Sequence, residues 1–201
     1  MIESYNGIKI AIIGAGGFGR EVYHHMLIDG YRTELYDDFD KTYRSSTDIN
    51  FDQYHVLVAI GDPVIRRNVV ESLPKNTKFF TYVSKRAIIL DKDVIIDEGS
   101  IICAGAILTT NITIGKHSHV NPNTTISHDC IIGDFLTATP NVSIAGNCII
   151  GNNVYLGTNS SVRDKIHICD NVTIGLNSGV VKNITEHGVY VGTPGKKIKS
   201  C

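Results

Sequence analysis

The chain has 201 residues, a formal net charge of −1 and 42% hydrophobic residues. This length forms one large or two small domains, and a charge so close to zero argues against binding to nucleic acids or acidic membranes. No apolar run approaches the ~20 residues of a membrane-spanning helix, and the start, MIESYNGIKIAIIG, lacks the basic region and cleavage site of a signal peptide. Five cysteines without a paired motif indicate a reduced, cytoplasmic protein.

The first part of the chain alternates predicted strands and helices. Strands are predicted at Lys9–Ile13, Glu34–Tyr36, Tyr54–Ile60 and Lys78–Val83. One helix is predicted at Arg20–Asp29, closed by Gly30, and a second from Pro63, with Asp62 as its N-cap. This order is typical of half of a doubly wound α/β fold. We therefore predict a Rossmann-like half-domain over residues 1–84.

A glycine-rich loop follows the first predicted strand. Its residues Gly14, Ala15, Gly16, Gly17, Phe18 and Gly19 match G-x-G-x-x-G, and Asp37 and Asp38 follow about twenty residues later. Glycines let the backbone approach a phosphate, and the helix N-terminus favours its negative charge. A lobe this small cannot build both halves of a dinucleotide site, which favours a nucleotide sugar over NAD. A tight turn without a ligand is the alternative, as is a polar strand end for the two acids.

From Lys85 to Val180 the sequence repeats in blocks of six residues. The last position of sixteen consecutive blocks, from Leu90 to Val180, holds Leu, Ile or Val, with Ala138 as the exception. A second column of small or β-branched residues lies two positions earlier. A period of six argues against a helix and is typical of a parallel β-helix. Both columns are expected to point into a narrow core.

Glycines recur with a second period of eighteen residues, at Gly115, Gly133 and Gly151 and again at Gly157 and Gly175. Three blocks per turn predict a triangular coil, with glycine at corners that need unusual backbone angles. Residues eighteen apart are then expected to stack about 4.8 Å from one another. We predict a β-helix domain over residues 85–201, in which the segment after Val180 breaks the phase and caps the coil.

Stacking separates three of the histidines in the repeats. His117 and His119 share one block, whereas His128 lies on a different face, so a single chain does not gather them into a zinc site. We predict no metal. The pair His128-Asp129 is expected to face outward near a corner, one coil from Gly146. An imidazole base beside a backbone N–H is what acyl transfer requires, and a solvated corner histidine is the alternative.

The glycine loop, the hexads and His128-Asp129 together resemble a known group of proteins. They resemble the nucleotide-aminosugar N-acyltransferases and sialic-acid O-acetyltransferase relatives among the hexapeptide-repeat acyltransferases. The resemblance runs nearly end to end and is carried by GAGGFGREV, YDD, AIGDPVIRR, NPNTTISHDCIIGDF, AGNCIIG and VYVGTPGKKI. It implies a Rossmann-like lobe on a left-handed parallel β-helix, and a homotrimer with active sites between subunits.

The same resemblance implies roles for individual residues. His128 would be the general base and Asp129 the acid that tunes it, and Gly146 would offer its amide to the acyl carbonyl. Acyl-CoA and a nucleotide-linked amino sugar would be the substrates. The remaining implied contacts are Thr137, Thr158 and Leu176 along the coenzyme A channel, Asn121 near the sugar, and Gly14, Ala15, Gly16, Gly17, Asp37 and Asp38 around the nucleotide.

Three places depart from the pattern of the relatives. Phe18 and Thr137 each stand where many relatives carry histidine, and Ser84-Lys85 where many carry His-Pro. The missing imidazole at Thr137 predicts more room beside the thioester. A longer acyl group, such as a hydroxyacyl, is therefore an option beside acetyl.

The predicted function is transfer of an acetyl or longer acyl group from acyl-CoA to the amine of a nucleotide-linked amino-deoxysugar. One alternative is O-acetylation of a sialic-acid-type sugar. Others are a zinc-dependent β-helix hydratase of the carbonic-anhydrase kind, and a non-catalytic assembly or sugar-sensing protein. Stoichiometric zinc would favour the hydratase, and an intact biological role after His128→Ala would favour the non-catalytic protein.

Overall fold

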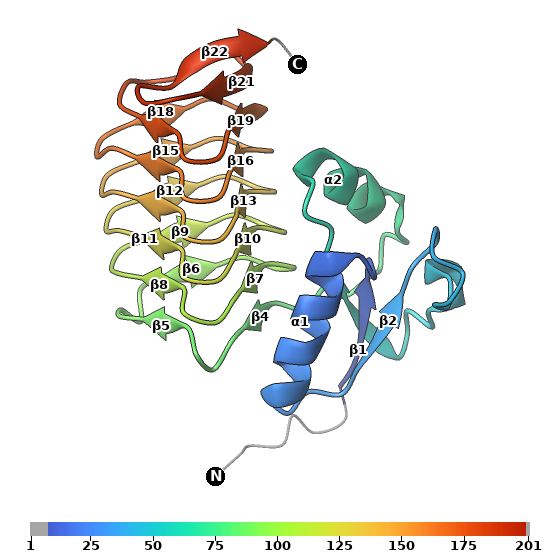
Figure 1. Ribbon diagram of the computed structural model, residues 1–201. Coiled ribbons are helices and arrows are strands. Elements are labelled where there is room, and N and C mark those ends of the chain that lie inside the picture. The colour runs from blue at the N-terminus through green and yellow to red at the C-terminus, as the bar shows by residue number, and fades with distance from the viewer. Residues whose placement is uncertain (1–7, 200–201) are drawn as a thin grey trace.

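The computed structural model describes residues 8–199 and arranges them as an α/β lobe beside a tall β-coil (Figure 1). The prediction about a signal peptide concerns mainly residues 1–7, which lie outside the described residues. No helix within residues 8–199 is long and apolar enough to span a membrane.

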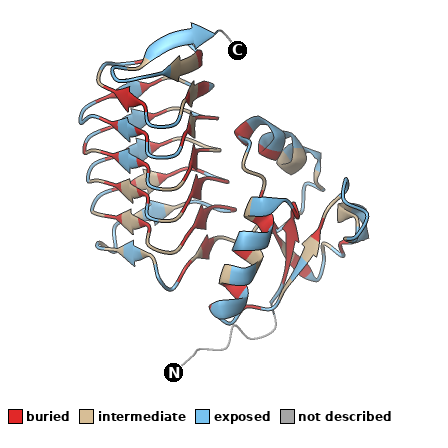
Figure 2. Cartoon of the chain, viewed as in Figure 1, coloured by how far each residue is buried: buried red, intermediate tan, exposed pale blue. Residues whose placement is uncertain are grey.

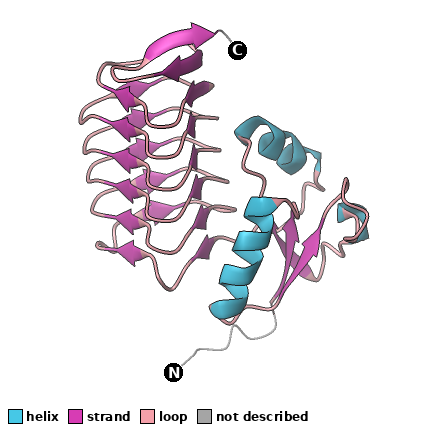
Figure 3. Cartoon of the chain, in the orientation of Figure 1, coloured by secondary structure: helices cyan, strands magenta, loops and turns pink. Residues whose placement is uncertain are grey.

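The N-terminal lobe is a parallel three-stranded sheet in the order β2-β1-β3, with one helix on each side (Figure 3). Its α1 buries Val22 and Met26 against Ile10 and Ile12 on one face of the sheet. Helix α2 packs Val69, Val70 and Leu73 against the other face. The elements are β1 Lys9–Ile13, α1 Gly17–Ile28, β2 Thr33–Tyr36, the 3₁₀ turn Ser46–Asp48, β3 Tyr54–Val58 and α2 Pro63–Ser72.

Both helix boundaries follow from local chemistry. Asp62 Oδ1 accepts hydrogen bonds of 2.9 Å from the N–H groups of Val64 and Ile65, and Pro63 is the first helical residue, as predicted. Helix α1 begins at Gly17 rather than Arg20, because Gly16 already takes the extended N-cap conformation. Beyond its end, Gly30 has a φ of +91°, which a glycine adopts without strain.

The second lobe is a left-handed parallel β-helix with three faces (Figure 1). The first face is β4 Tyr82–Val83, β7 Ile101–Ile102, β10 His119–Val120, β13 Thr137–Ala138, β16 Tyr155–Leu156, β19 Val172–Ile174, β21 Gly188–Val191 and β22 Lys196–Lys199. The second face is β5 Ile88–Ile89, β8 Ile107–Leu108, β11 Thr125–Ile126, β14 Ser143–Ile144, β17 Ser161–Val162 and β20 Gly179–Val180. The third face is β6 Ile95–Ile96, β9 Thr113–Ile114, β12 Ile131–Ile132, β15 Ile149–Ile150 and β18 His167–Ile168.

Residues eighteen apart stack as the period predicts, except in the first coil and in the last, where Val172 pairs with Gly188. Thr125 pairs with Ser143 and Ile126 with Ile144, whereas Ile89 pairs with Leu108, nineteen residues later. One extra residue in this coil shifts the phase, so that Ile89 packs against the core and Leu90 is 62% exposed. The prediction that Leu90 points inward is therefore wrong. The predicted strand Lys78–Val83 is also divided, since Phe79 bridges to Val56 while Tyr82–Val83 form β4.

The corner glycines have a different role from the predicted one. None of the glycines at 115, 133, 151, 157 and 175 has a positive φ. A Cβ on Gly133 would instead lie 2.8 Å from the backbone of Gly151 in the next coil. The left-handed conformation recurs every six residues at non-glycine positions, mostly asparagine, which tolerates it. These positions are Asn111, His117, Asn123, Asp129, Phe135, Asn141, Asn147, Asn153, Asn159, Lys165, Asn171 and Asn177.

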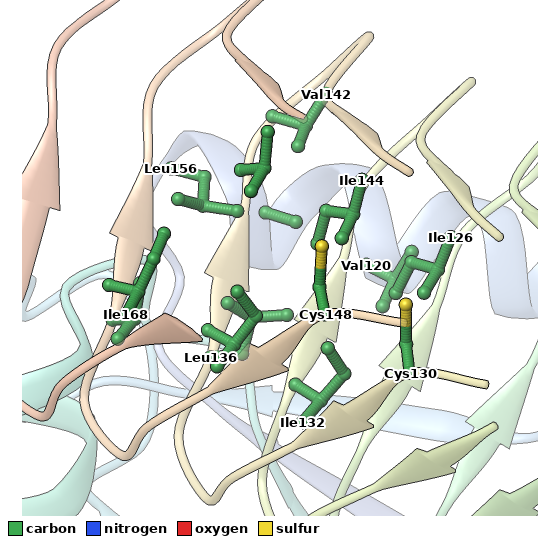
Figure 4. Close-up of a cluster of buried hydrophobic side chains, with 14 of the residues drawn as sticks. Val120, Ile126, Cys130, Ile132, Leu136, Val142, Ile144, Cys148, Leu156 and Ile168 are labelled. Atoms are coloured by element: carbon green, nitrogen blue, oxygen red, sulfur yellow. The ribbon is translucent and has the colours of Figure 1, made fainter. Parts of the chain in front are cut away.

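The two apolar columns fill the inside of the coil. Figure 4 shows Val120, Ile132, Ile144, Leu156 and Ile168 converging with the sulfur atoms of Cys130 and Cys148. The small-residue column lets the three faces approach, because a prism this narrow cannot hold two large side chains on every strand. This packed core keeps the corners that carry the candidate site rigid.

The two lobes are joined first at Asp29, at the end of α1. Asp29 is only 5% exposed, and its Oδ2 accepts hydrogen bonds from the Tyr82 hydroxyl, the Ser84 hydroxyl and the Lys85 N–H. Burial raises the pKa of Asp29, but these hydrogen bonds outweigh it and hold the pKa below its ordinary value. Ser84-Lys85, one of the departures from the relatives' pattern, thus ties the lobes together.

The second joint is the buried guanidinium of Arg66, which extends from α2 to the first face. It is fully buried and donates to carbonyl oxygens of both lobes. Burial lowers its pKa to about 9, so it stays charged at neutral pH. Its acceptors are His117 O at 2.9 Å, Ile60 O at 2.5 Å, Gly61 O at 3.3 Å, Phe135 O and Leu136 O at 3.0 Å, and Thr137 Oγ1 at 3.0 Å.

His119 completes this joint as a neutral imidazole. Its Nε2 lies 3.0 Å from Val58 O, and a carbonyl can only accept, so Nε2 carries the proton. Its Nδ1, 3.1 Å from Arg66 Nη1, is then the acceptor. The ring of Phe18 packs 5.0 Å from the His119 ring, so this departure in the glycine loop also belongs to the contact between lobes. Figure 2 shows the first face buried where the N-terminal lobe covers it.

Candidate functional site

The glycine loop connects β1 to α1, as the motif predicts. The fold requires glycine at only some of its positions. Gly14 has a φ of +103°, and a Cβ on Gly19 would overlap the Gly14 carbonyl oxygen. Gly16 has a φ of −61° and is exposed, and an added Cβ would meet no atom within 4 Å. Gly17 is equally open. The fold therefore requires Gly14 and Gly19, whereas the bare backbone at Gly16 and Gly17 faces open space at the start of a helix.

Asp37 and Asp38 order the backbone around this loop. Asp37 Oδ2 accepts a 2.7 Å hydrogen bond from the Ala15 N–H, and its Oδ1 accepts from the N–H groups of Phe39 and Asp40. Asp38 accepts from the N–H and hydroxyl of Ser46 and from the Ser45 hydroxyl. For Asp38 these hydrogen bonds hold the pKa below its ordinary value. Both carboxylates are thus ionised and already bonded beside the loop.

A cavity of about 450 Å³ lies between α1, β2 and residues 42–44, and its lining residue Arg20 donates to Ala15 O of the glycine loop. It shares no residue with the predicted nucleotide contacts. Its charged side chains include Arg20, Glu34 and Arg44.

His128 and Asp129 lie at the corner between the second and third faces, after β11. The side chain of His128 is 55% exposed, and its Nδ1 lies 2.7 Å from Asp129 Oδ2. The face of the imidazole packs against Gly146 in the next coil, where an added Cβ would stand 2.5 Å from Cε1, 2.6 Å from Nε2 and 3.0 Å from Nδ1. The Gly146 N–H has no acceptor among residues 8–199. A base and a free backbone donor therefore stand side by side.

The partner of Nδ1 fixes the tautomer of His128. An ionised carboxylate only accepts hydrogen bonds, so the proton lies on Nδ1 and the lone pair on Nε2. Asp129 stays ionised because hydrogen bonds from Asn111 and His128 lower its pKa. The lone pair thus lies on Nε2, close to Gly146 and directed away from Asp129, which is the arrangement a general base needs.

Three other predicted contacts lie at a different corner, between the first and second faces. Asn121 follows β10, Thr158 follows β16 and Leu176 follows β19. Asn121 is 8% exposed, and its Oδ1 has no partner among the described residues. Leu176 is 69% exposed. The width of the second face separates this corner from His128, so one chain does not bring the predicted residues together.

Thr137 is enclosed. It is 1% exposed on the first face, donates to Gly61 O at 2.7 Å and accepts from Arg66. The predicted extra room is therefore absent at Thr137 itself, because the guanidinium fills the space. A cavity of about 270 Å³ lies further along the same face, lined by Tyr155 and Thr173 and by the start of α2.

The histidines of the repeats lie apart. His117 and His119 are buried under the N-terminal lobe, whereas His128 is exposed at another corner. Within residues 8–199, no three side chains of His, Cys, Asp or Glu gather as they would around a metal ion.

Sequence reasoning missed Asn111 and Arg66. Asn111 Nδ2 donates to Asp129 Oδ1 at 2.6 Å, and it precedes Asp129 by eighteen residues, so the stacking period could have found it. No sequence signal distinguishes the buried Arg66 from its exposed neighbour Arg67.

Comparison with known proteins connects both lobes to one group. The profile of the PglD N-terminal domain matches residues 9–73. The acetyltransferase domain of PglB from Neisseria gonorrhoeae, also solved with acetyl coenzyme A, is 25% identical, with a TM-score of 0.87 over 94% of this chain and 99% of that chain. WeeI from Acinetobacter baumannii is 28% identical, with a TM-score of 0.84 over 95% of this chain and 100% of that chain.

A third structure shares the fold. PerB from Caulobacter crescentus, solved with CoA and GDP-perosamine, is 20% identical, with a TM-score of 0.85 over 94% of this chain and 97% of that chain. The α/β lobe, the hexapeptide coil and these likenesses agree with one another. Residues 9–73 thus match the PglD N-terminal domain, and the chain as a whole is similar to the acetyltransferase domain of PglB and to WeeI.

Proposed function

We propose that this protein transfers an acyl group from acyl-CoA to the amine of a nucleotide-linked amino-deoxysugar. The observation that carries the proposal is the corner of His128, Asp129 and Gly146. There an accessible imidazole lone pair lies beside a backbone N–H that has no acceptor among the described residues.

In this mechanism the amine nitrogen attacks the thioester carbonyl carbon. His128 Nε2 takes the proton that the nitrogen loses, and the Gly146 N–H stabilises the developing oxyanion. When the carbon–sulfur bond breaks, the coenzyme A thiolate leaves and receives a proton from the imidazolium. The products are an amide and free coenzyme A.

The relatives support the choice of substrates. PglB was solved with acetyl coenzyme A, and PerB with CoA and GDP-perosamine. In this chain we assign the nucleotide to the glycine loop, where Gly16 and Gly17 leave backbone open at the start of α1. Asp37 holds the loop through the Ala15 N–H, and both Asp37 and Asp38 are assigned to the same site. The buried, unpartnered Oδ1 of Asn121 is assigned to the sugar.

The separation of the two corners supports a homotrimer with shared sites. Asn121, Thr158 and Leu176 of one subunit would meet His128 and Gly146 of the next. An exposed apolar column on the third face, next to the His128 corner, suits such a contact. Ile95 is 55% exposed, Ile131 55% and Ile149 48%.

Two points remain part of the proposal. Because Arg66 fills the space beside Thr137, this residue gives no preference between acetyl and longer hydroxyacyl donors, and the proposal retains both. We place the reaction in the cytoplasm, a choice that four free cysteines support.

Assays of purified protein with UDP-, dTDP- and GDP-linked amino sugars and several acyl-CoAs test the proposal. We expect thiol release and an alkali-stable, amide-linked product. His128→Ala should lower kcat by about 10²–10⁴-fold, whereas His187→Ala, at an exposed histidine outside the repeats, should not. An alkali-labile ester product, or His128→Ala within threefold of the wild type from pH 6 to 9, would contradict it.

Mixed oligomers test the shared site. His128→Ala and Asn121→Ala each disable one corner, so co-assembled subunits should regain part of the activity by forming sites with both corners intact. An Ile131→Glu/Ile149→Glu variant should sediment as a monomer, whereas Ile28→Glu on α1, at a residue 70% exposed, should not. Absence of complementation would place the complete site within one subunit.

A further inference from the structure

A column of stacked corner residues passes directly beside His128. Asn111, Asp129, Asn147 and Lys165 are eighteen apart and have φ values of 52°, 59°, 60° and 58°. Asn and Asp tolerate this left-handed conformation, so the backbone alone accounts for asparagine at Asn111. It does not account for the contact that the Asn111 side chain makes.

The amide of Asn111 holds one oxygen of the carboxylate whose other oxygen holds His128. Asn111 Nδ2 donates to Asp129 Oδ1 at 2.6 Å, and His128 Nδ1 donates to Asp129 Oδ2 at 2.7 Å. Asp129 is exposed, with 43% of its side chain accessible, so nothing buries it in this rotamer. Its orientation therefore depends on these two hydrogen bonds.

We propose that Asn111 is a positioning residue for the acyl transfer. By fixing the Asp129 carboxylate, it keeps the proton of neutral His128 on Nδ1 and the lone pair on Nε2, beside Gly146. This inference rests on the proposed function, because it gives His128 the role of base. Without Asn111, the carboxylate turns freely in solvent, and His128 spends part of its time as the Nε2–H tautomer, which cannot accept the substrate's proton.

A purely structural role for Asn111 makes a different prediction. If the residue only supports the left-handed corner, any replacement that accepts this conformation should leave His128 unchanged. Glycine adopts the conformation without strain, so Asn111→Gly removes the amide while keeping the backbone. Asn171→Gly is the matched control, since Asn171 has a φ of 59° and is exposed at the corner between the third and first faces, away from both corners of the proposed site.

The experiment combines nitrogen-15 NMR of the histidine rings with kinetics of the full-length protein. In Asn111→Gly, neutral His128 should shift from the Nδ1–H towards the Nε2–H tautomer, and kcat should fall about two- to tenfold, as expected for one lost hydrogen bond. Both KM values should stay within twofold. Asn171→Gly should move neither the tautomer nor kcat.

Asn111→Asp keeps the corner preference but replaces the donor by an acceptor, so it should shift the tautomer in the same direction. It serves as the test if the glycine variant does not fold. A folded variant whose His128 keeps Nδ1–H and whose kcat equals that of the control overturns the proposal. The NMR readout needs no substrate. A failed acyl-transfer assay would therefore refute the proposed function, while the tautomer of His128 would still test the effect of Asn111 independently.

Discussion

Gly16 has φ, ψ values of −61° and −176°, which any residue adopts, and open space where a Cβ would be. We predict that Gly16→Val folds with an unchanged melting temperature and loses affinity for the sugar nucleotide by tenfold or more. The added side chain would stand where the phosphate approaches the backbone. The φ value gives no reason to expect strain from the substitution.

Calorimetric titration of each substrate checks this prediction. Acyl-CoA affinity should be retained in Gly16→Val, because the donor site is assigned to the other lobe. If acyl-CoA binding is lost and sugar-nucleotide binding is kept, the two ligands have been assigned to the wrong lobes.

Gly146 is the residue on which the His128 ring rests. A Cβ at this position would lie 2.5 Å from Cε1 and 2.6 Å from Nε2, so Gly146→Ala must displace the imidazole. We expect kcat to fall by at least tenfold, because the methyl group displaces the base from its position. Stability should change little, since the exposed ring can rotate away. Single-turnover kinetics with a urea titration would show both, and an unchanged kcat would separate Gly146 from the reaction.

For single residues, the sequence predicted contacts correctly where the stacking of coils brings two side chains together. The period of eighteen placed His128 against Gly146, and the same arithmetic places Asn111 against Asp129. It was misleading where backbone conformation decides, since asparagine rather than glycine takes the left-handed corners.

Helix α2 connects the lobes through one of two adjacent arginines. Arg66 is fully buried on the first face, whereas Arg67 pairs with Glu71 at the surface. We predict that Arg66→Met lowers the free energy of unfolding by about 3–5 kcal/mol, because several buried carbonyls lose their donor. Arg67→Met should change it by less than about 0.5 kcal/mol.

Urea unfolding followed by far-ultraviolet circular dichroism checks this prediction. Arg66→Met should also separate the unfolding of the α/β lobe from that of the coil, since the lobes would lose their main polar joint. If Arg66→Met is as stable as Arg67→Met, the hydrogen bonds of the guanidinium contribute nothing net.

Elements with a short repeat or a strong cap were predictable from the sequence. The hexads defined the β-helix because each block carries its own inward and outward residues, and Asp62-Pro63 marked the start of α2. The first coil was harder, because a single extra residue moves the inward position from Leu90 to Ile89 without disturbing the apolar pattern.

The docking of the two lobes could not be derived from any local pattern. Arg66 and His119 are polar residues that a single sequence would place at the surface, and their burial follows only from the way the lobes meet. Because the predicted contacts of the candidate site lie on separate corners, their full arrangement depends on a neighbouring subunit as well.

The buried histidines of this interface make the whole molecule sensitive to acid. Burial lowers the pKa of His117 from 6.5 to about 4, and burial with the charge of Arg66 lowers the pKa of His119 as well. The unfolded chain therefore binds protons at pH values where the folded chain does not. Stability should fall as the pH drops from about 6.5 towards 4, by at most about 1.4 kcal/mol per pH unit for each histidine.

Urea titrations between pH 7.5 and 4.5 measure this slope. His117→Asn should be less stable at neutral pH, because the ring packs between Phe79 and Phe135, yet it should lose less stability on acidification. His187→Ala, which removes an exposed imidazole, should keep the wild-type slope. Equal slopes in all three proteins would mean that other groups control the acid response.

The coil also sets rules for how such a chain can lengthen during evolution. An insertion of six residues in the repeats keeps every inward position but turns all later residues by one face, so a downstream catalytic corner would move to another side of the prism. An insertion of eighteen keeps the face and raises the later residues by one step of about 4.8 Å. Descendants of this chain that keep the glycine loop and His128 working together are therefore expected to gain or lose whole turns above Gly146, and to tolerate almost no change in length below His128.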